Sequence, residues 1–327
     1  MDILTVEPLD GDVLAWLAAR HAVKVAPELA HDGMAFRETL ARARAAIVPP
    51  SVAIDAALLK RAPRLRILGR LSAGAENIDL EACAQAGVEV VRPASASGPA
   101  EAEFVIAALL QMLRRVPIIS AEGLLVGREL NGCTVGVVGM TPAVRHLTPL
   151  LAAFGAKVLG YDPAVHVADP IWQRSGIEGV TLRDLLRNSD AVCVLLNFFP
   201  RYVGLFGERA LAECRRDQVL VSLAPSSLFN EVALARTLRD GPLAAAWFDN
   251  IDPALLDAGR PLSQADTLQV TPRVSGTTLQ SRTRSAWALA QRIDERLQET
   301  GRVGVRPMPT TDPTVESADP GVEPASF

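Results

Sequence analysis

The sequence is short of positive charge and contains no long apolar run. Its 33 Lys and Arg residues are outnumbered by 37 Asp and Glu residues, which gives a formal net charge of −4. Proteins bind nucleic acid or an anionic membrane surface through basic patches, so this balance disfavours both as partners. No apolar segment approaches the roughly 20 residues that cross a bilayer, and the N-terminus lacks a basic stretch followed by an apolar run. We expect a soluble, cytoplasmic protein.

The cysteines show no CxxC or other metal-ligand spacing. Three of them sit inside apolar runs, where a thiol behaves as a small core residue. We interpret them as buried structural residues and expect no metal site. They are Cys83, Cys133, Cys193 and Cys214.

Short β-branched runs alternate with amphipathic stretches along most of the chain, a pattern typical of parallel strands covered by helices. The length of 327 residues is enough for two domains with separate cores. The first series includes DILTV, AAIVP and LRILGRL and reaches a Ser-, Gly- and Pro-rich break at Pro93–Pro99. A long apolar helix is expected at residues 100–115. A second series follows with TVGVVG, KVLGYD, AVCVLL, QVLVSLA, PLAAAWFD and TLQVTP.

These segments predict an α/β protein with two Rossmann-like domains, each a doubly wound parallel sheet. A helix over about Gln280–Gln298 is expected to cross back to the first domain, which is therefore discontinuous. We assign residues 1–97 and 285–307 to the first domain and residues 98–284 to the second. Residues 308–327 have almost no large apolar side chains and are rich in Pro, Thr, Ser and acids, which predicts a disordered tail.

Two motifs point to a particular family. The segment LGRLSAGAENIDLEACAQAGVEVV places a loop of small residues after a strand. The segment GRELNGCTVGVVG is followed by AFGAKVLGYDP, and the spacing from Gly139 to Asp162 suits a dinucleotide-binding βαβ unit. Both resemble the D-isomer-specific 2-hydroxyacid dehydrogenase family, in particular its phosphoglycerate dehydrogenase-like members. The resemblance covers most of the chain and implies NAD as cofactor and a small carboxylate-bearing substrate.

The resemblance implies a first domain that binds substrate through the backbone amides of the small-residue loop. Small residues let the backbone approach an anion closely, although an ordinary strand-to-helix turn would have the same composition. The amides would be those of Ser72, Ala73 and Gly74.

The resemblance also implies a second domain that binds the dinucleotide. Asp162 would accept hydrogen bonds from the adenosine ribose and favour NAD over NADP. Asp249 would contact the nicotinamide amide, and Ala224 would keep the neighbouring backbone position.

The glycine fingerprint departs from the family pattern. G-x-G-x-x-G is replaced by Gly139-Met140-Thr141-Pro142-Ala143-Val144, so only the first glycine remains. Thr141 suits a helix N-cap and Pro142 a first helical position, but Pro142 has no N–H for a phosphate and Thr141 adds a Cβ. The Thr141 hydroxyl or Arg145 could meet a phosphate directly, so NAD binding stays open. Pro149 is expected to kink or end the same helix.

The three catalytic positions of the family also differ. Its substrate-clamping Arg follows a strand, and the chain has Pro225 at that point. Its acid–base His follows Thr-Pro near the last strand, where the chain has Arg273. The Glu that orients this His would be Ala254 without a gap, or Asp252 after a small shift. Arg stays protonated, so Arg273 is a binding residue or a structural one, and Arg273 and Asp252 are the candidates for altered chemistry.

Two hypotheses follow. In the first, the chain has lost the family's hydride transfer and is a pseudoenzyme or ligand-binding protein. In the second, it is an NAD-dependent oxidoreductase or other enzyme with replaced chemistry, using Arg273, Asp252, Asn197 or Tyr202. Transcriptional co-regulation, as in the C-terminal-binding-protein relatives, has only the fold in its favour. A homodimer through the helix at 100–115 is expected, less extensive than in the family because the following arm is short.

Overall fold

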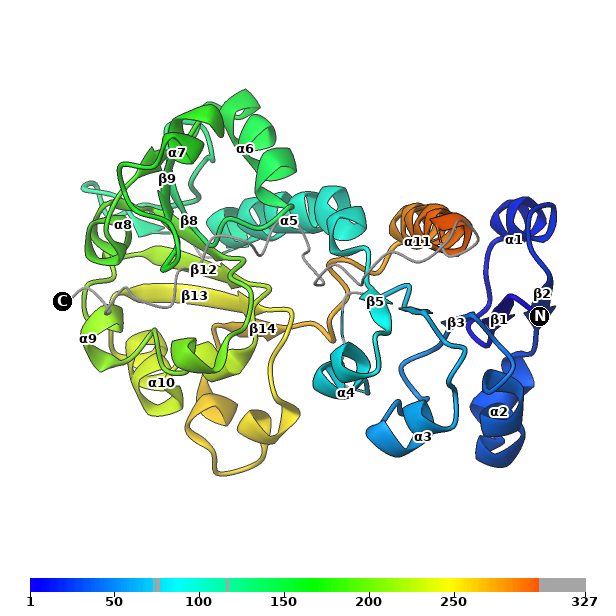
Figure 1. Cartoon of the computed structure of the whole chain (residues 1–327). Helices are drawn as coiled ribbons and strands as arrows, with labels where there is room; N and C mark the ends of the chain where they lie inside the picture. Colours follow the sequence, from blue (N-terminus) through cyan, green and yellow to red (C-terminus); the bar gives the residue numbers. More distant parts are fainter. Residues whose placement is uncertain (73, 75–76, 116–117, 300–327) are drawn as a thin grey trace. The chain divides into compact units, whose positions relative to one another are not determined.

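Two compact units make up the chain in the computed structural model, which describes residues 1–72, 74, 77–115 and 118–299 (Figure 1). The first unit joins Met1–Ser97 to the segment that begins at Thr278, and the second unit is Gly98–Thr277. The first boundary lies at 97/98, where the sequence places it, and the second lies at 277/278 rather than at 284/285. The remainder of the expected first domain, at 300–307, and the expected tail at 308–327 fall outside the described residues.

The first unit is a five-stranded parallel sheet in the order β2-β1-β3-β4-β5. Ile3 is in register with Val23 on one side and with Ala45 on the other, so β1 is an interior strand. The elements of this unit are β1 (Ile3–Thr5), α1 (Gly11–Ala18), β2 (Val23–Val25), η1 (Pro27–Ala30), α2 (Gly33–Leu40), β3 (Ala45–Ile47), α3 (Ala56–Lys60), β4 (Ile67–Gly69), α4 (Leu80–Gln85), β5 (Glu89–Val91), η2 (Ala94–Ser97) and α11 (Leu279–Glu299).

Helices cover both faces of this sheet. Successive strand residues point to opposite faces, so neighbouring residues contact different helices. Ile3 and Ile67 pack with α1 and α11, whereas Leu4 and Leu68 pack with α2, α3 and α4. The strands β1, β3 and β4 are fully buried, which explains why their sequences are continuous apolar runs.

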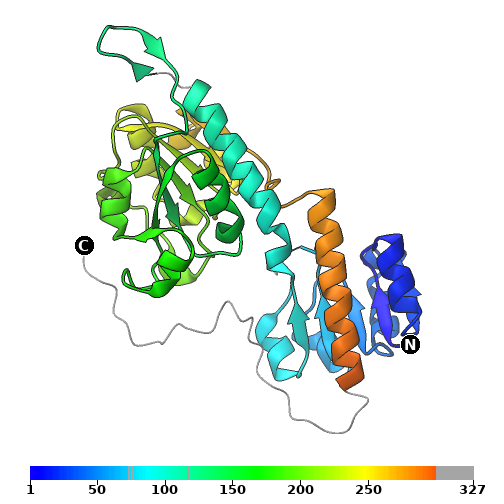
Figure 2. The same cartoon turned by 90° about the horizontal axis from the view of Figure 1, so that it is seen from above.

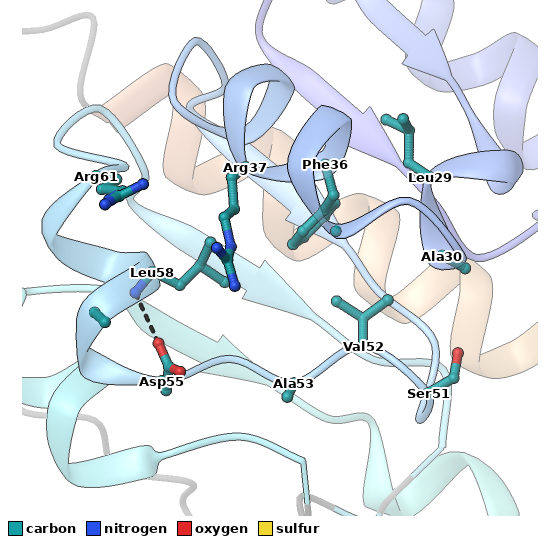
Figure 3. A pocket seen from close by; sticks show the side chains of 12 residues that line it. Leu29, Ala30, Phe36, Arg37, Ser51, Val52, Ala53, Asp55, Leu58 and Arg61 are labelled. Carbon is teal, nitrogen blue, oxygen red and sulfur yellow. Dashed lines mark hydrogen bonds between the residues drawn. The ribbon is translucent and has the colours of Figure 1, made fainter.

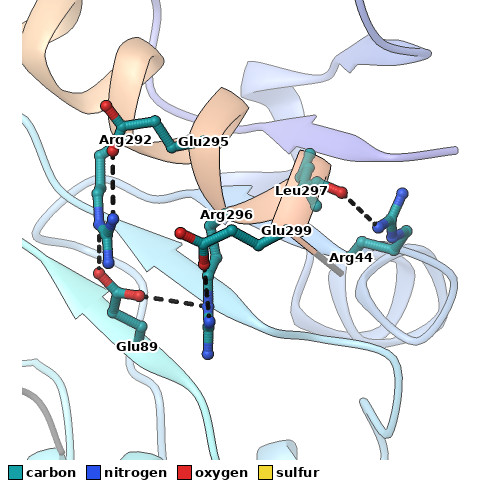
Figure 4. A network of polar contacts seen from close by, with 7 residues as sticks. All are labelled: Arg44, Glu89, Arg292, Glu295, Arg296, Leu297 and Glu299. Atoms are coloured by element: carbon teal, nitrogen blue, oxygen red, sulfur yellow. Dashed lines mark hydrogen bonds and ion pairs between the residues drawn. The ribbon is translucent and has the colours of Figure 1, made fainter. Parts of the chain in front are cut away.

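Charged side chains also fix α11 to the first unit (Figure 4). Glu89 on β5 accepts a hydrogen bond from Nε of Arg292 at 2.7 Å and forms an ion pair with Arg296 at 3.4 Å. The hydrogen bond with Glu89 raises the pKa of the Arg292 guanidinium. Arg44 donates to the carbonyl oxygen of Leu297 at 3.1 Å. The last helix therefore belongs to the unit that contains the N-terminus.

The second unit is built on a seven-stranded parallel sheet in the order β10-β9-β8-β11-β12-β13-β14. The long helix α5 and helix α6 cover one face, and α8, α9 and α10 cover the other (Figures 1 and 2). The elements are α5 (Gly98–Arg115), β6 (Ile118–Ile119), β7 (Leu125–Val126), β8 (Thr134–Val138), α6 (Val144–Ala153), β9 (Lys157–Tyr161), α7 (Pro170–Arg174), β10 (Glu178–Gly179), α8 (Leu182–Asn188), β11 (Ala191–Val194), η3 (Pro200–Tyr202), α9 (Glu208–Leu211), β12 (Gln218–Ser222), η4 (Ser226–Leu228), α10 (Glu231–Arg239), β13 (Leu243–Phe248), η5 (Pro253–Leu256), η6 (Pro261–Gln264) and β14 (Leu268–Val270).

The predicted α/β class, with two doubly wound parallel sheets, is confirmed. The six strands expected in the second series correspond to β8, β9, β11, β12, β13 and β14. The short strands β6, β7 and β10 have too few residues to leave a recognisable period in the sequence.

The start of α6 differs from the expectation. The helix begins at Val144 after Ala143, and no side chain caps it. Thr141 is therefore not the N-cap, and Pro142 is not the first helical residue. The turn between β8 and α6 is therefore longer than it would be if Thr141 capped the helix.

Of the two outcomes expected for Pro149, a kink or an early end, the early end is wrong, because α6 continues to Ala153. The proline lacks the N–H of one helical hydrogen bond, but Leu147 and Leu151 on the same helix are fully buried. Burial of this apolar face outweighs the loss of one backbone bond.

All four cysteines are buried, as their apolar surroundings predict. Burial raises the pKa of Cys83 to about 11 and the pKa values of Cys193 and Cys214 to about 12. Within the described ranges, no group of three His, Cys, Asp or Glu residues could hold a metal ion. Of the helices in this part of the chain, none has the length and apolar character to cross a membrane.

Candidate functional site

The loops that follow the strands of the second unit meet at one edge of its sheet, because all seven strands are parallel. Gly139 follows β8, at φ +103°. A Cβ at this glycine would lie 2.6 Å from the Cα of Leu196, which follows β11. The Gly139 N–H donates to the carbonyl oxygen of Tyr161 at 2.8 Å. Only glycine fits at this first position of the fingerprint, and we call the turn at Gly139 the glycine cradle.

Asp162 follows β9 and holds this cradle in place. Its carboxylate accepts hydrogen bonds from the N–H groups of Met140 and Ala164, each at 2.8 Å. An ionised carboxylate offers about four acceptor sites, so two stay available for hydroxyl groups of a ribose. The position that the resemblance assigns to ribose binding therefore also orients the glycine turn.

Thr141 is the residue of this turn with an unmet hydrogen-bonding requirement. Its Oγ1 is buried and has no hydrogen-bond partner among the described residues. A buried hydroxyl without a partner costs free energy, and a phosphate oxygen would satisfy it. Arg145, the other candidate for a phosphate, donates from Nε to Nε2 of His146 at 3.2 Å. Gly139, Asp162 and Thr141 together fit a dinucleotide, although Pro142 contributes no N–H.

The carboxylate of Asp249, which follows β13, accepts hydrogen bonds from the neighbouring turn. The residue is 2% exposed. Its Oδ1 accepts from the Thr271 hydroxyl at 2.6 Å and from the Val274 N–H at 2.9 Å, and its Oδ2 accepts from the Ser275 N–H at 2.9 Å. The Arg273 N–H donates to the Asp249 carbonyl oxygen at 2.7 Å. Asp249 therefore fixes the loop that carries the Thr-Pro-Arg sequence.

Arg273 occupies the left-handed region of the backbone map, at φ +56°. A non-glycine residue in this region is uncommon and is held there by its surroundings. The hydrogen bonds of Asp249 to both sides of Arg273 supply that constraint. Nothing in the sequence marks this conformation, because Asn or Gly would be its usual sign.

The loops after β12 and β13 are joined to each other. The Ser226 N–H donates to the Asn250 carbonyl oxygen at 3.0 Å, and the Asp252 N–H donates to Ser226 Oγ at 3.0 Å. The exposed carboxylate of Asp252 caps η5 by accepting from the Ala254 N–H at 3.0 Å. Ala224 is buried beneath these loops. Asp252 thus has a local structural partner as well as access to solvent.

An aromatic cluster lies in the loop after β11, a few residues beyond Leu196. The Arg201 guanidinium lies 5.2 Å from the ring centre of Phe199 and 5.0 Å from that of Tyr202, and it donates to the Tyr202 hydroxyl at 3.1 Å. Burial raises the pKa of Tyr161, and the nearby Asp162 and Tyr202 act in the same direction. Tyr202 was a candidate from the sequence, whereas Arg201 was not, because it belongs to no recognised motif.

In the first unit, the small-residue loop follows β4. Arg70 Nη2 donates to Ser72 Oγ at 2.6 Å, and its Nη1 donates to Oδ1 of Asn77. Ser72 is exposed, and Gly74 is half-buried. Ala73 lies outside the described residues. Arg70 and Asn77, both in the quoted motif, were not singled out from the sequence.

Glu7, after β1 in the same unit, was also missed. It is 7% exposed, accepts from the Leu71 N–H at 3.4 Å and lies 3.5 Å from Arg282 on α11. Burial raises the pKa of this carboxyl group, although Arg282 and Arg70 oppose the shift. The signal in the sequence would have been an acidic residue directly after an apolar strand, since this edge of a parallel sheet is where ligands bind.

The raised pKa of Glu7 predicts a pH dependence of stability. A carboxyl group whose pKa is higher in the folded state stabilises the fold at low pH, and this contribution is lost as pH rises above 4.5 through the folded pKa. The free energy of unfolding of the wild type, minus that of Glu7→Gln, should fall as pH rises from 4.5 towards neutrality. Urea unfolding at several pH values measures it, and a difference independent of pH would refute the prediction.

Comparison with known proteins places the chain in a family. Residues 106–275 match the model for the NAD-binding domain of D-isomer specific 2-hydroxyacid dehydrogenases. The chain is 30% identical to (S)-sulfolactate dehydrogenase of Chromohalobacter salexigens over 301 residues, which cover 89% of the chain and 97% of that enzyme. The chain therefore belongs to the D-isomer specific 2-hydroxyacid dehydrogenase family.

The chain covers different shares of other matching proteins. D-3-phosphoglycerate dehydrogenase of Mycobacterium leprae is 32% identical over 261 residues, which cover 77% of the chain and 48% of that enzyme, so the chain spans about half of it. The TT0316 protein of Thermus thermophilus has a TM-score of 0.73 at 25% identity, with 91% of the chain and 97% of that structure covered. D-lactate dehydrogenase from Aquifex aeolicus, solved with NAD and lactic acid, shares the fold at a TM-score of 0.69 and 20% identity, with 94% of the chain and 100% of that structure covered.

Proposed function

We propose that this family member binds a nicotinamide dinucleotide and a small carboxylate-bearing molecule but does not carry out the hydride transfer of 2-hydroxyacid dehydrogenases. The observation that carries the proposal is the Asp249-bonded turn, which presents Arg273 where the family resemblance calls for an acid–base His. A guanidinium keeps its proton at any relevant pH, so Arg273 cannot exchange one with a hydroxyl group.

The two other catalytic positions support the same proposal. Pro225 follows β12 and has no side-chain donor for a carboxylate clamp. Ala254 has no carboxylate, and the nearby Asp252 accepts a hydrogen bond from the Ala254 N–H. Neither Pro225 nor Ala254 can replace the group that the resemblance implies at its position.

Dinucleotide binding rests on the residues around the glycine cradle. Gly139 gives close backbone approach, Asp162 has acceptor sites for a ribose, and the Thr141 hydroxyl lacks a partner among the described residues. A nicotinamide dinucleotide, when bound, is a two-electron carrier. In this proposal it serves as a ligand that the chain holds and orients.

The second ligand is proposed to be a small carboxylate. The exposed Ser72 and the neighbouring Gly74 follow a parallel strand, where backbone N–H groups can surround an anion. The relatives named for sulfolactate and phosphoglycerate act on small anions of this class.

The proposal also includes a homodimer through α5, next to which Ile119 and Leu125 on the β6–β7 hairpin are each 72% exposed. A monomeric mass by light scattering would contradict that part.

Isothermal titration with NAD and NADH tests the first ligand. We expect saturable binding to the wild type and about tenfold weaker binding to Thr141→Val, because the variant loses a hydrogen bond to a charged group. Its free energy of unfolding should not fall, since the hydroxyl has no partner to lose within the described part of the chain. Thr148→Val is the matched control, because the Thr148 hydroxyl is buried in α6 and donates to the Val144 carbonyl oxygen at 2.6 Å.

Steady-state assays with NADH and a panel of 2-oxoacids test the absence of hydride transfer. We expect no turnover above background. Turnover at rates typical of dehydrogenases would overturn this part and favour an enzyme with replaced chemistry. In that case Asp252→Asn separates the alternatives, because it removes the exposed carboxylate and keeps its shape.

A further inference from the structure

A cavity of about 300 Å³ lies in the first unit, and none of the residues that line it belongs to the Ser72 loop (Figure 3). Its walls come from η1, α2, the segment after β3 and α3. This volume is at the small end of the range for ligand-binding pockets, which suits a molecule of about ten non-hydrogen atoms. The proposed function assigns no role to these residues.

The floor of the cavity is apolar. Leu29, Phe36, Val52 and Leu58 line it, and each is at most 7% exposed. These side chains also belong to the apolar core of the unit on this face of the sheet. The floor is therefore rigid and offers contact to an aromatic ring or a branched aliphatic group.

The rim of the cavity is cationic. Arg37 on α2 reaches over the floor between Phe36 and Leu58, and Arg61 lies at the end of α3 (Figure 3). Within the described part of the chain, neither guanidinium forms an ion pair or hydrogen bond. The acidic side chain on the wall, Asp55, is turned to α3 and accepts from the Leu58 N–H at 2.7 Å.

We propose that this cavity binds a small amphipathic monoanion, an aromatic or branched aliphatic carboxylate, with its apolar part on the floor and its carboxylate between Arg37 and Arg61. Guanidinium groups match carboxylates in geometry and are only weakly hydrated, so they bind such anions without first losing another partner. An uncharged ligand of the same shape would leave both cations unused.

The cavity wall is hydrogen-bonded to the chain that follows the Ser72 loop. The Ile54 N–H donates to the Asn77 carbonyl oxygen at 2.8 Å, and the Asp79 N–H donates to the Ile54 carbonyl oxygen at 2.9 Å. Asn77 Nδ2 also donates to the Val52 carbonyl oxygen. A ligand in the cavity thus contacts a segment that is hydrogen-bonded to the chain following the Ser72 loop.

The test uses benzoate as probe, with benzamide and acetate as the uncharged and ring-free comparisons, on the full chain. We expect benzoate to bind with a dissociation constant on the order of 1 mM, shifting the amide NMR signals of residues 52–58. Arg37→Gln and Arg61→Gln should each weaken binding by up to about fivefold, and the double variant by about twentyfold. Arg64→Gln, an exposed arginine outside the cavity, is the matched control and should bind as the wild type does.

Ala53→Phe provides a second test, because it places a ring in the cavity at an exposed position and should abolish binding without unfolding the unit. Equal binding of benzamide or acetate would overturn the proposed ligand class. Unchanged affinity in the double arginine variant, or no binding at about 10 mM benzoate, would overturn the site itself. None of these outcomes depends on NAD binding or turnover, so the site can fail while the proposed function stands.

Discussion

Asp249→Ala should lower the free energy of unfolding by about 3 kcal/mol, because three donors of the turn lose the buried carboxylate that accepts from them. The Thr271 hydroxyl and the N–H groups of Val274 and Ser275 all donate to this carboxylate. Urea unfolding followed by tryptophan fluorescence measures the change. Trp247 is a direct reporter, since its Nε1 donates to Thr271 Oγ1 at 3.2 Å.

Asp252→Ala is the matched control for this prediction. Asp252 is exposed and accepts from a single backbone N–H, that of Ala254, so its removal should cost about 1 kcal/mol, as for a lost helix cap. A loss of no more than about 1 kcal/mol for Asp249→Ala as well would show that the turn around Arg273 is held by other contacts. Weaker dinucleotide binding with unchanged stability would instead favour the ligand-contacting role that the resemblance implies for Asp249.

Gly139→Ala should lower the free energy of unfolding by about 3 kcal/mol or more and abolish dinucleotide binding. Two causes add: a φ of +103° that disfavours any side chain, and a Cβ that would lie 2.6 Å from the Cα of Leu196. The Leu196 backbone cannot easily move away, because the preceding Leu195 N–H donates to the Val138 carbonyl oxygen on β8 at 2.8 Å. Thermal unfolding and NAD titration on the same preparation measure both effects.

Gly132→Ala separates these two causes. Gly132 has φ +77°, but a Cβ there would meet nothing within 4 Å, so only the conformational penalty of about 1 kcal/mol remains. If both glycine variants lost the same stability, crowding against Leu196 would not contribute. If Gly139→Ala still bound NAD as the wild type does, the glycine cradle would not contact the phosphates of the dinucleotide.

The strands of the second sheet could be predicted because their sequences leave little choice. The run Thr134–Val138 is apolar, short and followed by Gly139, a combination that a buried parallel strand produces and a surface helix does not. A domain boundary was expected at Ser97 because the Pro- and Ser-rich stretch before it interrupts the alternation of strands and helices.

The details of the site were harder to predict, because they depend on contacts between distant segments. Thr141 has the chemistry of an N-cap, yet the helix starts later and leaves its hydroxyl buried. Glu7 and Arg282 are 275 positions apart, and nothing local pairs them. The left-handed backbone of Arg273 follows from hydrogen bonds to Asp249, which no pattern within the Thr-Pro-Arg segment encodes.

The division of the first unit into two chain segments has a consequence for biosynthesis. The strands β1, β3 and β4 leave the ribosome long before α11, and the whole of the second unit is made in between. Until Leu289 and Ile293 arrive, the face that contains Ile3 and Ile67 is covered by α1 alone. An apolar sheet face open for this long is a target for chaperones and for aggregation. A nascent chain stopped before residue 278 therefore contains all of the described second unit but lacks α11 of the first unit.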